Sequence, residues 1–394
     1  MLKLSTNSAT FSPQASRDER CLKLTFNQRL PDSIRGQYAL GVRPGEVVIP
    51  GFGFYVGIGE ELPLGLESVV LGLDFNYLGE GDVLHIVPRA NFARAIFRAN
   101  SSHNSFLLTE QCNHYCVMCS QPPKKEDDAR LAKPILEAIP LLPKGTRSIG
   151  ITGGEPTIHA ESLINIIGAC KRHLPNAGVH VLTNGVNFKD FYFAKRFADL
   201  RHPDLMFGIP VYSHIPEIHN FVVQSKNALD STLHGLLNLK TLGVKVELRV
   251  VLHKYTIPTL IELAKFLAVN FPFVDQVAFM GLEATGFAKT NWDDLWIHPR
   301  DYCTELTAAV TECARRGMTP LVYNLPLCWL NPRIYRFVVK SISDWKNDFP
   351  GECANCAAFS ACGGFFSSNL IRGATVGLEP FSSQKWDIQQ KNQL

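Results

Sequence analysis

From residue 105 onward the sequence alternates between short strand-like runs and segments with helical periodicity, and this alternation constrains the fold more than any other feature. The run SFLLT at 105–109 begins the series, and SIGIT at 148–152 is the next strand-like run. The segment after SIGIT has apolar residues at helical spacing, from Leu163 to Cys170. Strands that alternate with helices predict right-handed βαβ units around a parallel sheet.

Six strand-like runs of this kind are present. They lie at 105–109, 148–152, 179–183, 206–212, 244–252 and 276–280. The helices expected between and after them span 129–139, 162–173, 188–200, 229–242, 259–270 and 299–316. No Gly-x-Gly-x-x-Gly dinucleotide fingerprint accompanies these units. The sequence therefore predicts an α/β fold with a partial (β/α)6 TIM-like barrel, in which chemistry is expected where strands end and loops begin.

The first 104 residues have a different pattern, with short β-like runs between Gly- and Pro-rich turns. These runs lie at 22–26, 46–50, 68–73 and 82–87. The glycine-rich stretch GFGFYVGIG is interpreted as turns and bulges, and the polar first 20 residues are expected to form a mobile leader. The predicted domains are a β-rich N-terminal domain at 1–104, the barrel at 105–317 and a Cys-rich C-terminal region at 318–394.

The composition is that of a globular protein and argues against some classes of partner. The chain has 394 residues, of which 46% are hydrophobic and 19% are charged, and its net charge of +3 comes from scattered Lys and Arg. Such scatter does not indicate a nucleic-acid partner, and no apolar run is long enough to cross a membrane. Eleven cysteines without a secretion signal predict a cytoplasmic protein.

Three cysteines, Cys112, Cys116 and Cys119, follow the first strand with the spacing Cys-x3-Cys-x2-Cys. Iron–sulfur cubanes normally take four Cys thiolates. A metal site that lacks one protein ligand is open to an outside molecule, as in catalytic coordination. A zinc site completed by a residue such as His114 is the alternative, because zinc also uses closely spaced cysteines.

The second strand is followed by Gly153-Gly154-Glu155-Pro156. Two glycines let the backbone approach a ligand without obstruction by Cβ. The Glu155 carboxylate is suited to bind an ammonium group through a charge-assisted hydrogen bond. An ordinary polar turn, with Glu155 near the start of the next helix, is the alternative.

These two motifs, in this order on the first two of six βα units, resemble those of the radical S-adenosylmethionine (radical SAM) superfamily. In that family three cysteines hold a [4Fe–4S] cluster, and the methionine part of SAM chelates the fourth iron. The resemblance implies that Cys112, Cys116 and Cys119 are the cluster ligands and that Gly153, Gly154 and Glu155 bind the SAM amino group. Met118 departs from the pattern, because the family usually has an aromatic residue before the third cysteine.

Weaker matches to the same family follow on the later strands. Thr183 and Asn184 after the third strand, Ser213 after the fourth and Arg249 on the fifth occupy places where family members often contact SAM. Each has an alternative reading. Asn184 precedes a glycine in a common turn pair, Ser213 is suited to cap a helix, and Arg249 is suited to a core ion pair.

A second group of cysteines lies near the C-terminus. It consists of Cys353, Cys356 and Cys362, with Cys328 upstream. The group resembles the first part of the auxiliary-cluster (SPASM or twitch) motif of radical SAM maturases. The full motif has a further cysteine shortly afterward, which is absent here, since Phe366 stands four residues past Cys362. The resemblance implies one auxiliary [4Fe–4S] cluster, and a structural four-cysteine zinc site is the alternative.

A closer resemblance concerns the substrate. The phrases TEQCNHYCVMCSQPP, MGLEATGFA and SISDWKNDFPGECANCAAFSACGGFF are similar to those of the His-Xaa-Ser system radical SAM maturases, C-type. The resemblance implies reductive cleavage of SAM to a 5′-deoxyadenosyl radical, which takes hydrogen from a ribosomally made peptide with His-Xaa-Ser repeats. It also implies an external electron donor and, as a further partner, a companion maturase. The sequence assigns no catalytic residue beyond the cluster ligands.

Two other functions remain open at this point. A radical SAM enzyme that acts on RNA or on a small metabolite would share every barrel motif. A non-catalytic zinc or iron–sulfur binding module would share the cysteines alone.

Overall fold

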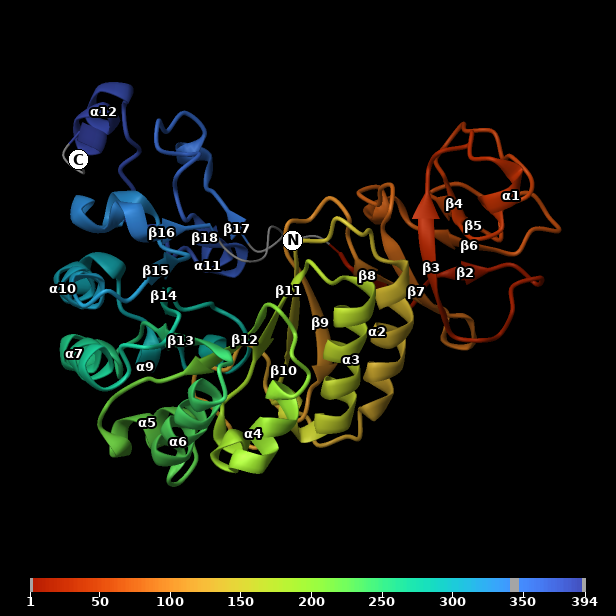
Figure 1. Cartoon of the computed structure of the whole chain (residues 1–394). Helices are drawn as coiled ribbons and strands as arrows, with labels where there is room; N and C mark the ends of the chain where they lie inside the picture. The colour runs from red at the N-terminus through yellow and green to blue at the C-terminus, as the bar shows by residue number, and fades with distance from the viewer. Residues whose placement is uncertain (1–2, 341–346, 392–394) are drawn as a thin grey trace. The chain divides into compact units, whose positions relative to one another are not determined.

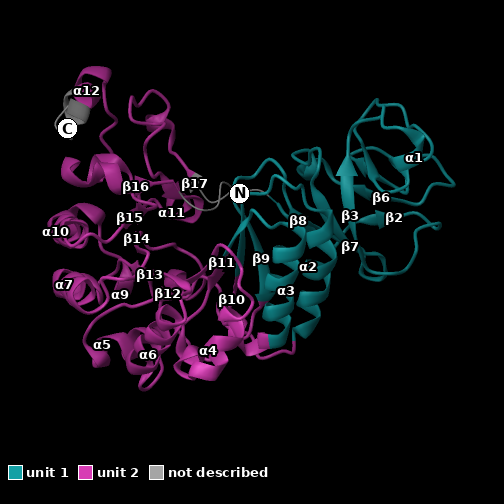
Figure 2. Ribbon diagram, viewed as in Figure 1, with its two compact units in different colours: residues 1–108, 128–151, 161–179 teal, residues 109–127, 152–160, 180–394 magenta. Residues whose placement is uncertain are grey.

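A computed structural model of the chain describes residues 3–340 and 347–391. It divides into two compact units (Figure 2). Unit 1 comprises Met1–Leu108, Asp128–Ile151 and Glu161–Val179, and unit 2 comprises Thr109–Asp127, Thr152–Ala160 and His180–Leu394. Part of the maturase-like phrase, residues 341–346, lies outside the described residues.

The N-terminal part of unit 1 is rich in β-structure, as predicted (Figure 1). Its strands are β1 (Ser5–Thr6), β2 (Thr10–Phe11), β3 (Arg20–Thr25), β4 (Ala39–Val42), β5 (Phe54–Ile58), β6 (Ser68–Leu71), β7 (Val83–Val87) and β8 (Phe92–Phe97), with the short helix α1 (Asp32–Arg35). Within the described residues they form one sheet in the order β1-β8-β7-β3-β4-β5-β6-β2. Its apolar core includes Leu24, Phe54, Val56, Phe75 and Ile86.

Two expectations for this region are wrong. The run at 46–50 is not a strand, and β5 lies instead within the glycine-rich stretch that was interpreted as turns. The glycines serve close contacts beside and within this strand. A Cβ atom at Gly53 would lie 2.2 Å from the carbonyl oxygen of Gly36, and one at Gly57 would lie 2.4 Å from that of Glu60. Glycine is therefore required by packing at these two positions, whereas Gly51 (φ +96°) and Gly59 (φ +67°) have the left-handed backbone of turns.

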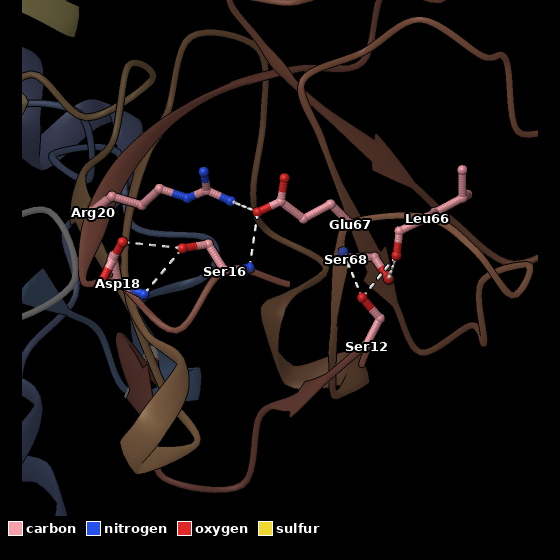
Figure 3. A network of polar contacts seen from close by, with 7 residues as sticks. All are labelled: Ser12, Ser16, Asp18, Arg20, Leu66, Glu67 and Ser68. Atoms are coloured by element: carbon pink, nitrogen blue, oxygen red, sulfur yellow. Dashed lines mark hydrogen bonds and ion pairs between the residues drawn. The ribbon is translucent and has the colours of Figure 1, made fainter. Parts of the chain in front are cut away.

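The expectation of a mobile leader is also wrong. β1 pairs with β8 and β2 pairs with β6. Figure 3 shows how the next residues are held: Ser12 Oγ donates to Leu66 O over 2.7 Å, and Ser16 N donates to Glu67 Oε1 over 3.0 Å. Glu67 also forms an ion pair with Arg20. Backbone pairing and polar side chains anchor this segment, so its low hydrophobicity did not predict its order.

The second sheet confirms the α/β fold with a partial TIM-like barrel. Its strands are β9 (Asn104–Thr109), β10 (Ser148–Gly153), β11 (Gly178–Leu182), β12 (Leu205–Pro210), β13 (Lys245–Val251), β14 (Gln276–Met280), β15 (Pro320–Tyr323) and β16 (Val338–Val339). In the described part of the chain their spatial order follows the sequence, from β9 to β16. The six expected strands are all present, and β15 and β16 extend the sheet through parallel pairing. These two strands have only four and two residues, which is too short for a clear strand pattern in the sequence.

Helices alternate with these strands (Figure 1). They are α2 (Ala132–Ala138), α3 (Ala160–His173), α4 (Phe191–Ala198), α5 (Pro216–Val223), α6 (Ala228–Thr241), α7 (Leu260–Asn270), α8 (Gly286–Thr290), α9 (Trp292–Leu295) and α10 (Cys303–Arg315). The six expected helices correspond to α2, α3, α4, α6, α7 and α10. The apolar residues that predicted α3 are buried, Leu163 and Cys170 included.

The C-terminal part of unit 2 has little regular structure. β17 (Asn347–Asp348) pairs with β18 (Phe365–Phe366), and α11 (Ser367–Ile371) and α12 (Ser383–Lys391) follow. Among the residues that the structure describes, no helix has the length and apolar character needed to cross a membrane.

Candidate functional site

The loop after β9 carries the three spaced cysteines, and the turn after β10 packs directly against it. Gly154 N donates to Thr109 O over 2.9 Å, and Glu155 N donates to Gln111 O over 2.8 Å. A Cβ atom at Gly154 would lie 2.1 Å from Gln111 O, and one at Gly153 would lie 2.2 Å from Thr109 O. Only glycine fits such close approaches of backbone to backbone. The structure therefore brings the two sequence motifs together.

The three thiols lie near enough to influence one another. Burial raises the pKa of Cys116 far above its ordinary value, and Cys119 and Cys112 raise it further. Burial also raises the pKa of Cys112 to about 11, although His114 N, 3.4 Å from its sulfur, opposes the shift. Metal binding must therefore displace protons from these thiols.

The donor set fits a cluster that leaves one position open. Within the described ranges, no three His, Cys, Asp or Glu side chains are arranged around a single metal ion. The thiolates of a cubane bind different iron atoms, so they need not converge on one point. Three thiols on one loop, beside a turn without Cβ atoms, suit a cluster whose remaining iron faces an outside ligand.

Glu155 is buried and accepts hydrogen bonds from the protein at both carboxylate oxygens. Its Oε1 accepts from Thr157 N at 2.9 Å, from Thr157 Oγ1 at 2.5 Å and from Thr183 Oγ1 at 2.7 Å. Its Oε2 accepts from Asn184 N at 2.6 Å. Burial raises the pKa of Glu155, while these donors lower it. The carboxylate also caps the short 3₁₀ helix that follows, so the turn reading describes part of its role.

Asn184 joins this network to the cysteine loop. Its side-chain nitrogen donates to Asn113 Oδ1 over 2.6 Å, and its carbonyl oxygen accepts from Thr232 Oγ1 at 3.0 Å. Thr183, whose hydroxyl donates to Glu155, accepts from Gly185 N at 3.1 Å. The loops after β9, β10 and β11 thus share one set of hydrogen bonds.

A comparison with protein families decides the class of this barrel. Residues 106–267 match the family model of the radical SAM superfamily. The chain contains a radical SAM domain. Such a domain indicates an enzyme and implies a [4Fe–4S] cluster together with SAM. No curated protein sequence matches the chain significantly.

Solved structures of other radical SAM proteins are similar to this chain over part of its length. SuiB of Streptococcus suis is 17% identical, with 55% of this chain and 48% of SuiB covered and a TM-score of 0.43. The protein anSMEcpe with bound AdoMet is 18% identical, with 54% and 61% covered and a TM-score of 0.42. Methylornithine synthase (PylB) is 12% identical, with 72% and 84% covered and a TM-score of 0.45. The chain thus spans about half of SuiB, and these likenesses carry no conclusion about its substrate.

In the radical SAM domain, Ser213 lies just beyond β12 and is fully buried. Its Oγ lies 3.1 Å from Thr259 Oγ1 and accepts from Ile215 N, also at 3.1 Å. These contacts fix the turn before α5, but Ser213 does not cap that helix, whose N-cap is Ile215 without a side-chain cap.

Arg249, on β13 of the radical SAM domain, forms the core ion pair considered as its alternative. Its Nη1 lies 2.5 Å from Glu247 Oε1, and its Nη2 lies 2.8 Å from Met280 Sδ. Glu247 is buried, accepts a hydrogen bond from Gln276 and lies 3.4 Å from His180 Nε2. The guanidinium therefore has one oxygen partner and one thioether partner within the sheet.

The structure also brings the C-terminal cysteines together. Burial raises the pKa of Cys353, and Cys362, Cys328 and Cys356 raise it further, to about 11 in total. Burial likewise raises the pKa of Cys328, with added effects from Cys362 and Cys356. All four predicted ligands therefore lie near one another, including Cys328 from a separate segment.

Backbone N–H groups donate to the sulfur atoms of Cys362 and Cys356 in this group. Leu327 N donates to Cys362 Sγ over 3.4 Å, and Phe381 N donates to Cys356 Sγ over 3.3 Å. Hydrogen bonds to sulfur stabilise thiolates and tune the potentials of iron–sulfur clusters.

Sequence reasoning did not identify two residues that the network uses. Thr157 follows the Gly-Gly-Glu-Pro turn and donates twice to Glu155. Its place two residues after an acidic cap was a usable signal. Asn113 accepts from Asn184, 71 residues away, and no local pattern reveals such a pair.

Proposed function

We propose that Cys112, Cys116 and Cys119 hold a [4Fe–4S] cluster that binds SAM, and that the enzyme modifies a ribosomally made peptide. The main support for the cluster assignment is the close backbone contact between the cysteine loop and the Gly153-Gly154 turn. The three thiols and the two glycines of the turn therefore lie at the same edge of the barrel.

A cluster held by Cys112, Cys116 and Cys119 would supply the site for one-electron cleavage of SAM to methionine and a 5′-deoxyadenosyl radical, with the electron drawn from an external reductant. The protein's part is to bind and orient the cluster and SAM and to exclude water. Cys116 is half-buried and packs against the apolar cluster that contains Met118 and Tyr212. This apolar surrounding keeps water from the reacting centre.

The turn after β10 is proposed to receive the SAM amino group. Gly153 and Gly154 leave their backbone atoms partly accessible, whereas Glu155 lies behind them and is buried. Glu155 Oε2 accepts a hydrogen bond from Asn184 N, and a carboxylate oxygen has the capacity to accept a second. Glu155 then acts both as an acceptor for the ammonium and as the group that holds Thr183 and Asn184 in place.

The peptide substrate is proposed from sequence resemblance. The phrases around Cys112, at 280–288 and around Cys353 are similar to those of the His-Xaa-Ser system maturases. The cluster of Cys328, Cys353, Cys356 and Cys362 supports a second [4Fe–4S] site, as such maturases carry. We propose a peptide with His-Xaa-Ser repeats as substrate, an external reductant and a companion maturase as partners, and the cytoplasm as location.

The test is anaerobic reconstitution with iron and sulfide, followed by SAM and dithionite. We expect 5′-deoxyadenosine and methionine in equal amounts, and loss of both when Cys112, Cys116 and Cys119 are replaced by Ala. A Cys170→Ala variant, altered in helix α3, is the matched control and should retain cleavage. Cleavage that survives the triple replacement would overturn the assignment.

A second experiment tests the substrate. A His-Xaa-Ser repeat peptide is co-expressed with the enzyme, with and without a companion maturase, and its mass is measured. A mass change that needs this enzyme supports the peptide assignment. No change in either arm, with SAM cleavage intact, would favour an RNA or small-molecule substrate.

A further inference from the structure

The segment after β14 connects two parts of unit 2 that the proposed function treats separately. It contains the phrase MGLEATGFA at 280–288, which the resemblance singled out but to which no role was assigned. One of its neighbours is the loop of Cys112, Cys116 and Cys119. The other is α11, which begins five residues after Cys362.

The contact with the cysteine loop is made by backbone groups. Gly286 has φ +52°, a left-handed conformation that favours glycine, and a Cβ atom there would lie 2.4 Å from Cys119 O. Backbone conformation and close packing therefore both require glycine at this position. Phe287 N donates to Cys119 O over 2.8 Å. Asn291 Nδ2 donates to Val117 O over 2.8 Å. The segment therefore holds the backbone on both sides of Met118.

The contact with α11 is made by one buried side chain. Asn369 Oδ1 accepts from Ala284 N at 2.8 Å, and Asn369 Nδ2 donates to Leu282 O over 2.8 Å. The amide thus replaces a backbone strand partner for residues 282–284. Asn369 is 5% exposed, so neither bond can be exchanged for water at low cost.

Apolar packing follows the same path. Leu282, Ala284 and Met118 belong to one buried cluster, with Cys116 and Ala374 packed against it. A displacement of Asn369 is therefore transmitted to the cysteine loop by packed side chains as well as by hydrogen bonds.

We propose that Asn369 is a positioning residue, which couples the C-terminal cysteine region to the loop of Cys112, Cys116 and Cys119 through residues 281–291. Its effect on a bound cluster rests on the proposed function, whereas the coupling between the segments does not. The geometry makes the conformation of the Cys112, Cys116 and Cys119 loop depend on the position of Asn369 on α11.

The coupling is tested by hydrogen–deuterium exchange on the full-length protein without cluster. In Asn369→Ala we expect exchange about tenfold faster at 281–291 and 112–122, because two buried hydrogen bonds are lost. Helix α3 should be unchanged, which shows that the fold is retained. Asn270→Ala, which removes an exposed amide bonded to Phe266 O, is the matched control and should leave 112–122 as in the wild type.

Two further variants keep the proposal falsifiable if Asn369→Ala does not fold. Asn369→Asp keeps the acceptor for Ala284 N but turns a carboxylate oxygen toward Leu282 O, so it should also accelerate exchange at 281–291 and 112–122. Asn291→Ala removes the bond to Val117 O and should accelerate exchange at 112–122 but not at 365–374. Wild-type exchange at 112–122 in a folded Asn369 variant would overturn the proposal.

The last readout is spectroscopic. After reconstitution and reduction, we expect the electron paramagnetic resonance signal that changes on SAM addition to have shifted g values in Asn369→Ala, but not in Asn270→Ala. An unchanged signal would contradict the effect on the cluster. If the wild type itself forms no SAM-responsive cluster, the proposed function fails, while the exchange experiment still tests the coupling.

Discussion

Asn184, after the third barrel strand, donates its side-chain N–H to Asn113 Oδ1 over 2.6 Å, and Asn113 lies beside Cys112. Because Asn184 N also donates to Glu155, one residue joins the three loops that bear the predicted site. This relationship makes the cysteine loop a part of the barrel edge and not a free appendage.

Replacing Asn184 by Ala removes the bond to Asn113 and the bond that Asn184 Oδ1 accepts from Val186 N, but leaves the backbone bond to Glu155. We expect a loss of about 1–2 kcal/mol in the free energy of unfolding, as for a buried hydrogen-bond partner. We also expect slower SAM cleavage with iron content retained. Urea unfolding and product analysis measure the two effects. Equal stability and equal rate would show that the bond does not organise the site.

Glu155→Gln tests the role of the buried carboxylate. One side of a glutamine must present N–H groups, either to Asn184 N or to the three donors at Oε1, so donors would oppose each other. We expect a loss of roughly 2–4 kcal/mol in the apo protein by urea unfolding. Glu262→Gln, on the surface of α7, is the control and should cost under about 0.5 kcal/mol. A glutamine variant as stable as the wild type would leave ligand binding as the main role of Glu155.

The Glu247–Arg249 pair is expected to behave as a buried ion pair. Glu247→Gln leaves the guanidinium without its negatively charged partner and should cost about 3 kcal/mol or more. Combining it with Arg249→Met should recover part of that loss, because no uncompensated charge remains. A double-mutant cycle with urea unfolding measures the coupling. Additive effects would argue that Arg249 is free to serve a ligand instead.

Alanine at Cys353 or Cys356 tests the C-terminal site. If all seven predicted ligands hold two cubanes, iron should fall from about eight to about four atoms per chain, since each cubane has four irons. Cleavage of SAM should persist. Metal analysis by mass spectrometry distinguishes this result from a zinc site, in which zinc would fall and iron would stay constant.

Buried neutral histidines predict a pH dependence of stability. Burial lowers the pKa of His253 to about 3, and that of His219 also to about 3. In the unfolded chain these groups take up protons near pH 6.5. Their contribution is therefore complete above pH 6.5 and is lost progressively as the pH falls toward 3. We expect a lower urea midpoint at pH 5 than at pH 7.5.

His253→Asn is the variant that checks this cause. Between pH 6.5 and pH 5, the free energy of unfolding of this variant should fall by up to about 2 kcal/mol less than that of the wild type. His234→Asn, at an exposed position on α6, should keep the wild-type slope. A slope that is the same in all three proteins would assign the pH dependence to other groups.

The sequence predicted well those features that depend on local periodicity. The helix at 162–173 is present as α3 because its apolar residues repeat at the helical period and its buried face needs them. The six expected strands appear for a similar reason. The sequence missed the order of residues 5–20, since β1 and β2 depend on partners more than 50 residues away.

The sequence by itself determined the barrel class and the spacing of Cys112, Cys116 and Cys119 beside the Gly-Gly-Glu-Pro turn, because both are encoded within short segments. Only the tertiary structure decided that protein donors bond both oxygens of the Glu155 carboxylate, that Arg249 pairs with Glu247, and that Asn369 reaches residues 282–284. These contacts join residues 28 to 87 positions apart, or turn a side chain toward one of several possible partners. Such choices are made by packing and burial, which act on the folded chain as a whole and leave no local pattern.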